Sequence, residues 1–233
     1  MRQGDFKTGG LLLLLSLACV GVALIWEQPF AGFVAFSAAF SFLLVSLAYL
    51  FSWPRLLGKK RTGHLLPSSY LLFWPYHLLN YLSLALFRLS GKAAPFNEIE
   101  PGLYLGSRLF PRDQPALSAV QVASVLDLTA EFPEVPFLRR VPGYLCIPLL
   151  DRTAPTKKEL EIALRFIQDR LSQGPVYVHC ALGHGRSATV VLAYLLASDK
   201  FPDLQSAITY VRTKRPGIKL HSCQKKLLAG LRL

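Results

Sequence analysis

Two long runs without a charged residue stand at the start of the chain and restrict what it can fold into. Gly9–Trp26 holds 18 uncharged residues, Pro29–Trp53 holds 25, and only Glu27 and Gln28 separate them. A helix needs about 20 apolar residues to cross roughly 30 Å of hydrocarbon. Both runs approach or exceed that length, so the sequence predicts two transmembrane helices, over 9–26 and 29–53, joined as a tight hairpin.

The outer ends of this predicted hairpin carry basic residues. Arg2 and Lys7 precede the first run, and a basic cluster over residues 55–61 follows the second. Positive charge favours the cytoplasmic side of a membrane, so we expect an integral membrane protein whose remaining chain faces the cytoplasm. A cleaved signal peptide is the main alternative for the first run. It needs a cleavage site of small residues, and Leu24–Glu27 is a poor one.

A further apolar segment covers residues 64–87. It contains no Lys, Arg, Asp or Glu, but Pro67 and Pro75 interrupt it and aromatic residues crowd it. Basic residues flank it on both sides, at Arg61 and Arg88. Aromatic and basic residues of this kind prefer the membrane–water interface, so the segment is expected to lie there. A third transmembrane helix is the alternative, and it would place the rest of the chain on the other side of the membrane.

The chain changes character near residue 95. Residues 1–94 carry eight Lys or Arg and two Asp or Glu, whereas residues 95–233 carry eighteen and twelve and resemble an ordinary soluble sequence. We therefore expect a membrane anchor over 1–94 and a separate domain over 95–233. The net charge of +12 favours anionic partners, such as phosphorylated substrates or membrane lipid. The sequence has no nucleic-acid-binding signature, so nucleic acid is not an expected partner.

In the second domain, short apolar runs alternate with helical periodicity. The predicted strands cover residues 103–106, 124–129, 145–150 and 176–179, and the predicted helices cover 156–173, 187–198, 203–214 and a segment from 222. Thr156 and Glu159 have the spacing of a helix capping box. Strands that alternate with helices indicate an α/β fold with a central, mostly parallel sheet flanked by helices.

The stretch 178–188 carries the candidate chemistry. It follows a predicted strand and begins a predicted helix, where loop N–H groups and the helix N-terminus together favour an anion. Gly183 and Gly185 permit a tight loop that comes close to a phosphate. Cys180 lies at the start of the loop, where the same dipoles lower the pKa of a thiol towards about 3.5–7.5. The planar guanidinium of Arg186 suits two phosphate oxygens at once.

His-Cys-x5-Arg-Ser resembles the signature of the protein tyrosine phosphatase superfamily, with the compact spacing of its dual-specificity branch, over about residues 97–233. The resemblance implies that Cys180 attacks phosphorus and forms a phosphocysteine, and that Arg186 binds the phosphate and stabilises the transition state. It also implies that Ser187 supports the thiolate as a leaving group and that His179 orients Cys180. The implied phosphate-binding residues are Ala181, Leu182, Gly183, His184, Gly185 and Arg186. No metal or other cofactor is implied.

The same family carries a general acid on a loop about thirty residues before the cysteine. Asp151 stands 29 residues before Cys180, after a predicted strand and before the capped helix. The resemblance implies that Asp151 protonates the leaving oxygen and then deprotonates the water that releases phosphate. The alternative is a phosphate-recognising binding module that has lost turnover. The substrate stays open between a phosphoprotein and a phosphorylated lipid headgroup.

Residues outside the motif have less specific expectations. Asp127 is expected to be structural, and Cys146 to be a small buried residue or, under oxidation, a disulfide partner of Cys180. Five basic residues are candidates for the rim of the site: Arg139, Arg140, Arg212, Lys214 and Arg215.

Overall fold

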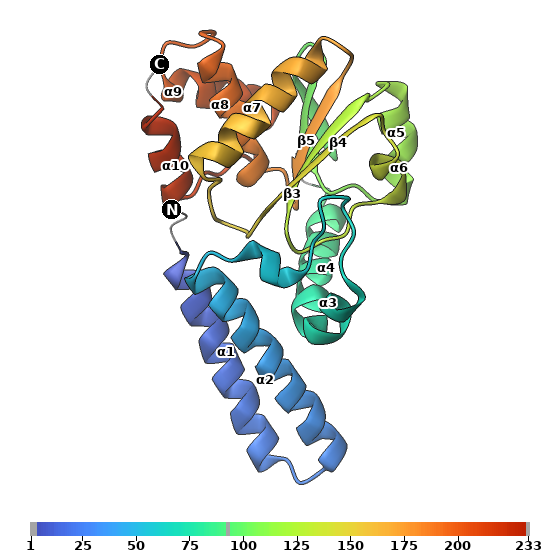
Figure 1. Cartoon of the computed structure of the whole chain (residues 1–233), viewed down its shortest axis with the longest axis vertical. Helices are drawn as coiled ribbons and strands as arrows, with labels where there is room; N and C mark the ends of the chain where they lie inside the picture. Colours follow the sequence, from blue (N-terminus) through green and yellow to red (C-terminus); the bar gives the residue numbers. More distant parts are fainter. Residues whose placement is uncertain (1–3, 92–93, 232–233) are drawn as a thin grey trace.

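The computed structural model describes residues 4–91 and 94–231, which form a helical hairpin, a short helical segment and a layered α/β domain (Figure 1). The hairpin consists of α1 (Phe6–Ile25) and α2 (Pro29–Leu50). Each helix is long and apolar enough to cross a membrane. Asp5 caps α1 by accepting hydrogen bonds from the backbone N–H groups of Lys7 and Thr8.

α1 and α2 pack closely through small and hydroxyl-bearing residues. Ser16 Oγ donates to the carbonyl of Ala39, and Ser46 Oγ donates to the carbonyl of Gly9, each at 2.7 Å. Gly9 lacks room for a side chain, because an added Cβ would lie 2.8 Å from Leu50 Cδ2. Small residues let helix backbones approach, and a paired hydroxyl avoids the cost of an unsatisfied polar group in hydrocarbon. The two helices therefore form one tightly joined unit.

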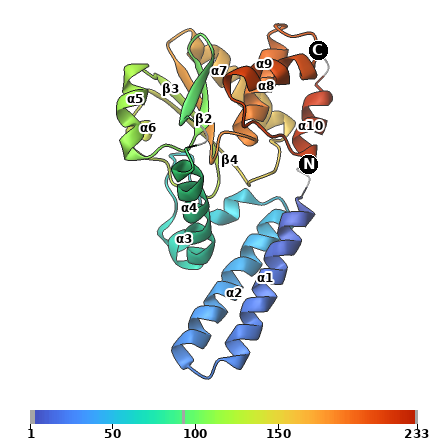
Figure 2. The same cartoon turned by 180° about the vertical axis from the view of Figure 1, so that it is seen from behind.

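The chain after α2 first touches the α/β domain and then forms two helices. A 3₁₀ turn, η1 (Pro54–Leu57), leads into an antiparallel bridge between Lys59 and Leu65. The helices α3 (Pro67–Leu72) and α4 (Trp74–Leu89) then lie beside α2 and below the α/β domain in both views (Figure 1 and Figure 2). α4 has 16 residues and is about 24 Å long at 1.5 Å per residue, which is short for a transmembrane helix.

The α/β domain is built on a five-stranded sheet in the order β1-β2-β5-β3-β4. The strands are β1 (Phe96–Glu100), β2 (Leu103–Ser107), β3 (Ser124–Thr129), β4 (Gly143–Leu149) and β5 (Val176–Cys180). β1 pairs antiparallel with β2, and the other pairings are parallel. The predicted fold class is confirmed. The central strand β5 ends at Cys180, so the cysteine emerges at the carboxyl edge of the sheet, where α/β proteins usually place their sites.

Helices cover both faces of this sheet. One face carries α7 (Lys157–Leu171), α8 (Arg186–Ala197), α9 (Leu204–Lys214) and α10 (Ser222–Ala229), and the other carries η2 (Pro111–Asp113), α5 (Gln114–Ala119) and α6 (Pro136–Arg139). The four predicted helices and the capping box of Thr156 and Glu159 are all present. The sequence reading missed β1, α5 and α6. β1 has polar residues at three of its five positions, and α5 and α6 are short helices of six and four residues that contain proline.

Candidate active site

The turn 181–185 joins β5 to α8 and forms the centre of the site. α8 begins at Arg186, so the unpaired N–H groups of its first turn point towards this loop. Gly183 has a φ of +72°, and a Cβ added there would collide with the carbonyl of Gly106. Only glycine fits this position without strain. The loop therefore has the close approach and the donors that an anion site needs.

Cys180 lies at the base of this loop with only 3% of its surface exposed. Ser187 Oγ donates a hydrogen bond to Cys180 Sγ at 3.2 Å. Burial acts to raise the pKa of the thiol, but the charge of Arg186 and the hydrogen bonds from Ser187 and Gly183 outweigh it, so the pKa of Cys180 falls below its ordinary value. The lowered pKa favours the thiolate, which is the nucleophilic form.

Arg186 is buried, and its two Nη atoms are occupied by neighbouring oxygens. They form a bidentate pair with the Glu131 carboxylate at 2.9 and 2.7 Å, and Nη1 also donates to the carbonyl of Leu149 at 2.8 Å. Nη2 lies 3.2 Å from Asp151 Oδ1. Within residues 4–91 and 94–231, the Nε atom of Arg186 has no hydrogen-bond partner. Its N–H is therefore a free donor for an incoming phosphate oxygen.

Asp151 follows β4 and keeps 56% of its side chain exposed. Its loop is held from α10, because Gln224 Nε2 donates to the carbonyl of Thr153 at 2.9 Å and Cys223 Sγ donates to the carbonyl of Arg152 at 3.1 Å. The carboxylate is thus open to solvent while it contacts the guanidinium of Arg186. A residue that exchanges protons with a leaving group and with water needs this combination of contact and access.

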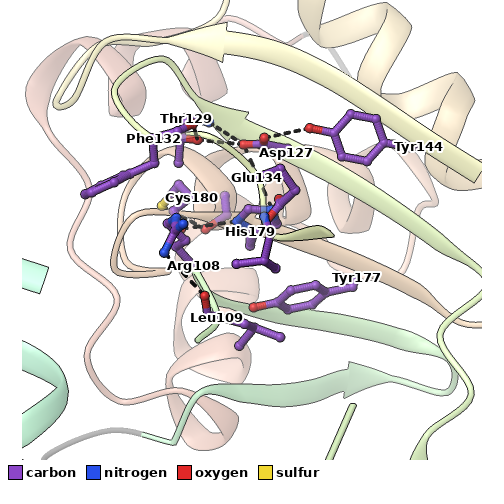
Figure 3. A network of polar contacts seen from close by, with 12 residues as sticks. Arg108, Leu109, Asp127, Thr129, Phe132, Glu134, Tyr144, Tyr177, His179 and Cys180 are labelled. Carbon is purple, nitrogen blue, oxygen red and sulfur yellow. Dashed lines mark hydrogen bonds and ion pairs between the residues drawn. The ribbon is translucent and has the colours of Figure 1, made fainter. Parts of the chain in front are cut away.

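His179 anchors the loop from the opposite side of the strand (Figure 3). Its Nε2 lies 2.6 Å from Glu134 Oε2 and 4.0 Å from Asp127 Oδ1, and its ring stacks on Tyr177. Burial acts to lower the pKa of His179, but the two carboxylates outweigh it and raise the pKa above the ordinary value. The contacts of His179 with Glu134 and Asp127 fix the strand position that precedes Cys180.

Asp127 in turn pairs with Lys59, which lies in the segment between α2 and α3. Lys59 Nζ lies 2.5 Å from Asp127 Oδ2 and donates to Thr129 Oγ1 at 2.6 Å, and Tyr144 donates to the same carboxylate at 2.8 Å. The side chains of Lys59 and Asp127 are both fully buried. Asp127 is therefore structural, as expected, but the sequence reading missed its partner 68 residues earlier in the chain.

Three of these buried side chains form a set that metal sites also use. Ligand atoms of Asp127, Glu134 and His179 lie within 4.8 Å of one another. Lys59 already places its ammonium group against Asp127, and His179 is paired with Glu134. Because the ammonium group of Lys59 already occupies the cation position beside Asp127, the set fits an ion-pair network better than a metal cation.

His184 and Arg215 brace the loop from its outer side. His184 packs edge-to-face on Phe87 of α4 with ring centroids 5.1 Å apart, and burial together with the charge of Arg215 lowers its pKa to about 4. Arg215 donates to the carbonyls of Gly183 and Leu182 at 2.8 and 3.0 Å. Of the five basic rim candidates, Arg215 is a buried loop brace, Arg139 is half-buried, and the exposed ones are Arg140, Arg212 and Lys214.

The expected alternative of a disulfide between Cys146 and Cys180 conflicts with the sheet register. Cys146 pairs with Asp127, which pairs with His179, so Cys146 lies two strands away from β5. Strands are about 4.8 Å apart, and a disulfide needs Cα atoms within about 7 Å. Cys180 also follows His179 and therefore points to the other face of the sheet. Cys146 is a small buried residue with a free thiol, and burial raises its pKa.

An activated thiol at the end of the central strand of such a sheet, with an arginine at the start of the next helix, defines the cysteine-dependent phosphatases of the tyrosine phosphatase type. Residues 103–230 match the family described as dual specificity phosphatase, catalytic domain, and the chain belongs to that family.

Relatives of this chain act on two kinds of phosphate ester, according to their names. Phosphatidylglycerophosphate phosphatase PTPMT2 of Arabidopsis thaliana is 32% identical over 164 residues, which cover 68% of this chain and 70% of the relative. Human dual specificity protein phosphatase 22 is 34% identical over 121 residues, or 51% of this chain and 64% of the relative. The crystal structure of Tk-PTP in its active form aligns with a TM-score of 0.54 and 29% identity over 59% of this chain and 95% of that one. The chain is therefore a phosphatase of phosphorylated lipid or protein.

Proposed function

We propose that this protein is a membrane-anchored phosphatase that removes the terminal phosphate from a phospholipid headgroup. The observation that carries the proposal is the direct packing of the catalytic loop on the membrane-proximal helices, through Phe87 and His184. The lipid-directed relative from Arabidopsis thaliana, which matches 68% of this chain, supports the same substrate class. A membrane-bound site meets lipid headgroups at a high effective concentration.

The proposed reaction has two steps. The Cys180 thiolate attacks phosphorus, the ester P–O bond breaks, and Asp151 gives its proton to the leaving alkoxide of the lipid. Asp151 then takes a proton from water as the water oxygen attacks the phosphocysteine, which releases inorganic phosphate and the thiolate. Ser187 stabilises the thiolate in both steps, because it donates a hydrogen bond to Cys180 Sγ.

Phosphate binding in this scheme is shared between the loop and Arg186. The backbone N–H groups of residues 181–186 surround the phosphate oxygens, as they do in other helix-start anion sites. The Nε–H of Arg186 adds a charged donor, and Glu131 holds the guanidinium in place. His184 contributes through its backbone, since its ring packs on Phe87.

The substrate class is tested with the full-length enzyme in liposomes. We would compare kcat/KM for phospholipid phosphomonoesters with kcat/KM for phosphotyrosyl peptides, using Cys180→Ser as the inactive control. We expect lipid to be preferred by tenfold or more and Cys180→Ser to lose turnover while it still binds vanadate. A tenfold preference for peptides would overturn the lipid assignment, and wild-type turnover by Cys180→Ser would overturn the nucleophile.

A further inference from the structure

The helix α4 turns an apolar face outward, where a water-soluble helix turns a polar one. Its outward face presents large apolar side chains that recur at helical spacing and are 47–73% exposed: Leu78, Leu79, Leu82, Leu86 and Leu89. Its inward side buries Tyr76 and Leu84 together with the polar His77. A helix that faces water exposes polar residues, whereas helices in a bilayer expose apolar residues and turn polar ones towards protein. The exposed leucine face of α4 therefore suits contact with lipid.

Two polar residues of this helix, His77 and Asn80, are engaged within the protein. His77 is 4% exposed, and its Nδ1 donates to the carbonyl of Glu131 at 3.1 Å, while its Nε2 lies 3.0 Å from Ser69 Oγ. Asn80 Nδ2 donates to the carbonyl of Tyr76 at 2.8 Å. Internal pairing of this kind is what a segment inside hydrocarbon requires. Glu131 is also the residue that holds Arg186, so the segment directly supports the catalytic site.

The lower end of α4 reaches the middle of the hairpin. Trp74 Nε1 donates to Ser37 Oγ at 3.3 Å. Ser37 lies thirteen residues before the end of α2 at Leu50, a distance of about 20 Å along the helix axis. If α2 crosses the bilayer, the indole of Trp74 lies near the bilayer centre, well below the headgroups.

The upper end of α4 is fixed beside the catalytic loop. Phe87 packs on His184, and Arg88 pairs with Asp113 at 2.6 Å and donates to Ser107 at 3.0 Å. Both views show α4 rising from α3, beside the hairpin, to the α/β domain (Figure 1 and Figure 2). The helix thus runs from beside the middle of α2 to the loop that carries Cys180, and its leucine face is exposed along this length.

We propose that α3 and α4 form a re-entrant segment in the leaflet next to the catalytic domain, and that its leucine face binds the acyl chains of the phospholipid whose headgroup reaches Cys180. The insertion rests only on α1 and α2 crossing the bilayer, whereas the acyl-chain contact rests on the lipid phosphatase activity proposed above. The two parts need separate experiments.

Insertion depth is measurable because the chain has three tryptophans, Trp26, Trp53 and Trp74. The variant Trp26→Phe/Trp53→Phe leaves Trp74 as the single fluorophore, and Trp26→Phe/Trp74→Phe leaves Trp53 as the matched control. Both would be reconstituted in phosphatidylcholine vesicles with bromine near the glycerol backbone or near the chain ends. We expect Trp74 to be quenched most by bromine near the chain ends and Trp53 by shallow bromine. Strongest quenching of Trp74 by shallow bromine, or no quenching, would overturn insertion.

The acyl-chain contact is tested by making the exposed face polar. Leu82→Gln and Leu86→Gln should lower the ratio of kcat/KM for a long-chain phospholipid to kcat/KM for p-nitrophenyl phosphate by about tenfold. Ile162→Gln, at an exposed apolar position of α7 in the catalytic domain, should leave that ratio unchanged. An unchanged ratio in both leucine variants would overturn the acyl-chain contact. Absence of lipid turnover by the wild-type enzyme would instead refute the proposed function and leave the Trp74 result standing.

Discussion

At the scale of single residues, the reactivity of the site depends on the balance of charge around one buried thiol. Burial alone would keep Cys180 protonated, and only the positive charge of Arg186 and the hydrogen bonds to sulfur favour the thiolate. Arg186 itself is held by Glu131 and touches Asp151. Each of these contacts can be removed by a single substitution, so its effect on the pKa of Cys180 can be measured.

Replacing Ser187 with alanine should raise the pKa of Cys180, because the variant lacks the hydroxyl that donates to Cys180 Sγ. The wild-type pKa is lowered, so the thiolate persists to a pH below the ordinary range of a thiol and is lost as the pH falls further. In Ser187→Ala this loss should begin at higher pH. A hydrogen bond to a charged group contributes about 1.5–3 kcal/mol, so iodoacetate should alkylate the variant roughly tenfold more slowly at acidic pH.

The matched control for this experiment is Ser198→Ala, at an exposed serine at the end of the same helix. Its alkylation profile should coincide with that of the wild-type enzyme. If the profile of Ser187→Ala also coincides with it, Ser187 does not stabilise the thiolate.

Replacing Asp151 with asparagine should lower kcat by roughly 10²–10⁴, because general acid–base catalysis contributes a factor of that size. The basic limb of the kcat–pH profile should also flatten, since asparagine has no proton to lose. Asp169→Asn, at an exposed position of α7, should retain wild-type kcat. A kcat of Asp151→Asn within threefold of wild type would mean that another group is the acid.

At the scale of elements, the segment between the hairpin and the catalytic domain is part of the domain's own core. The Lys59–Leu65 bridge places a fully buried ammonium group beside β3, and Asp127 next to it also faces His179. An isolated charge in such a place is strongly unfavourable, so each partner depends on the other. The segment is therefore structural for the site and not only a tether.

Replacing Lys59 with methionine should destabilise the catalytic domain by about 3–5 kcal/mol, because Asp127 stays buried without its cation. Thermal unfolding in detergent should show a Tm lower by roughly 6–20 °C. Lys60→Met, at the exposed neighbouring position, should leave Tm nearly unchanged. The double variant Lys59→Met/Asp127→Asn should lose less than the sum of the two single variants, and strict additivity would contradict the ion pair.

The sequence predicted the local parts of this site and missed the distant ones. The loop 180–187 was predictable because its cysteine, glycines, arginine and serine are neighbours in the chain, and strand and helix periodicity flank them. Glu131 lies 55 residues before Arg186, and Lys59 lies 68 residues before Asp127. No spacing rule joins residues that only the packed sheet brings together. The sequence places Lys59 among the flanking charges of the anchor, since a basic residue after an apolar run is usually in water.

Across the whole molecule, each part contacts the next: the hairpin contacts the helices α3 and α4, and these contact the catalytic domain. α2 contacts α4, α4 contacts the loop that carries Cys180, and Lys59 of the Lys59–Leu65 bridge contacts β3. The boundary at residues 94 and 95 and the cytoplasmic orientation stay predictions, and the Trp74 quenching experiment decides between the interfacial position expected for 64–87 and the deeper insertion proposed above. A hairpin with both ends on one side of the membrane follows if α1 and α2 both span it.

The orientation is tested with reporters that are active on only one side of the membrane. A reporter fused after Leu233 and one inserted between Glu27 and Gln28 should give opposite results, with the chain end in the cytoplasm and the hairpin turn outside. Signals from the same side at both positions would contradict a spanning hairpin. A chain end outside would contradict the cytoplasmic orientation predicted from the basic flanks.

The attachment of α4 at both of its ends has a consequence for the choice of phosphate. Trp74 bonds to the middle of α2 at one end of the helix, and Arg88 pairs with Asp113 at the other. If α1 and α2 span the bilayer, the height of Cys180 above it is set by the length of a folded helix and not by the reach of a loose chain. An enzyme on a flexible tether samples every phosphate within its radius, whereas an enzyme held in this way meets phosphorus atoms only in a thin layer parallel to the membrane. The enzyme should therefore select phospholipids by the height at which the headgroup holds its phosphate above the bilayer surface.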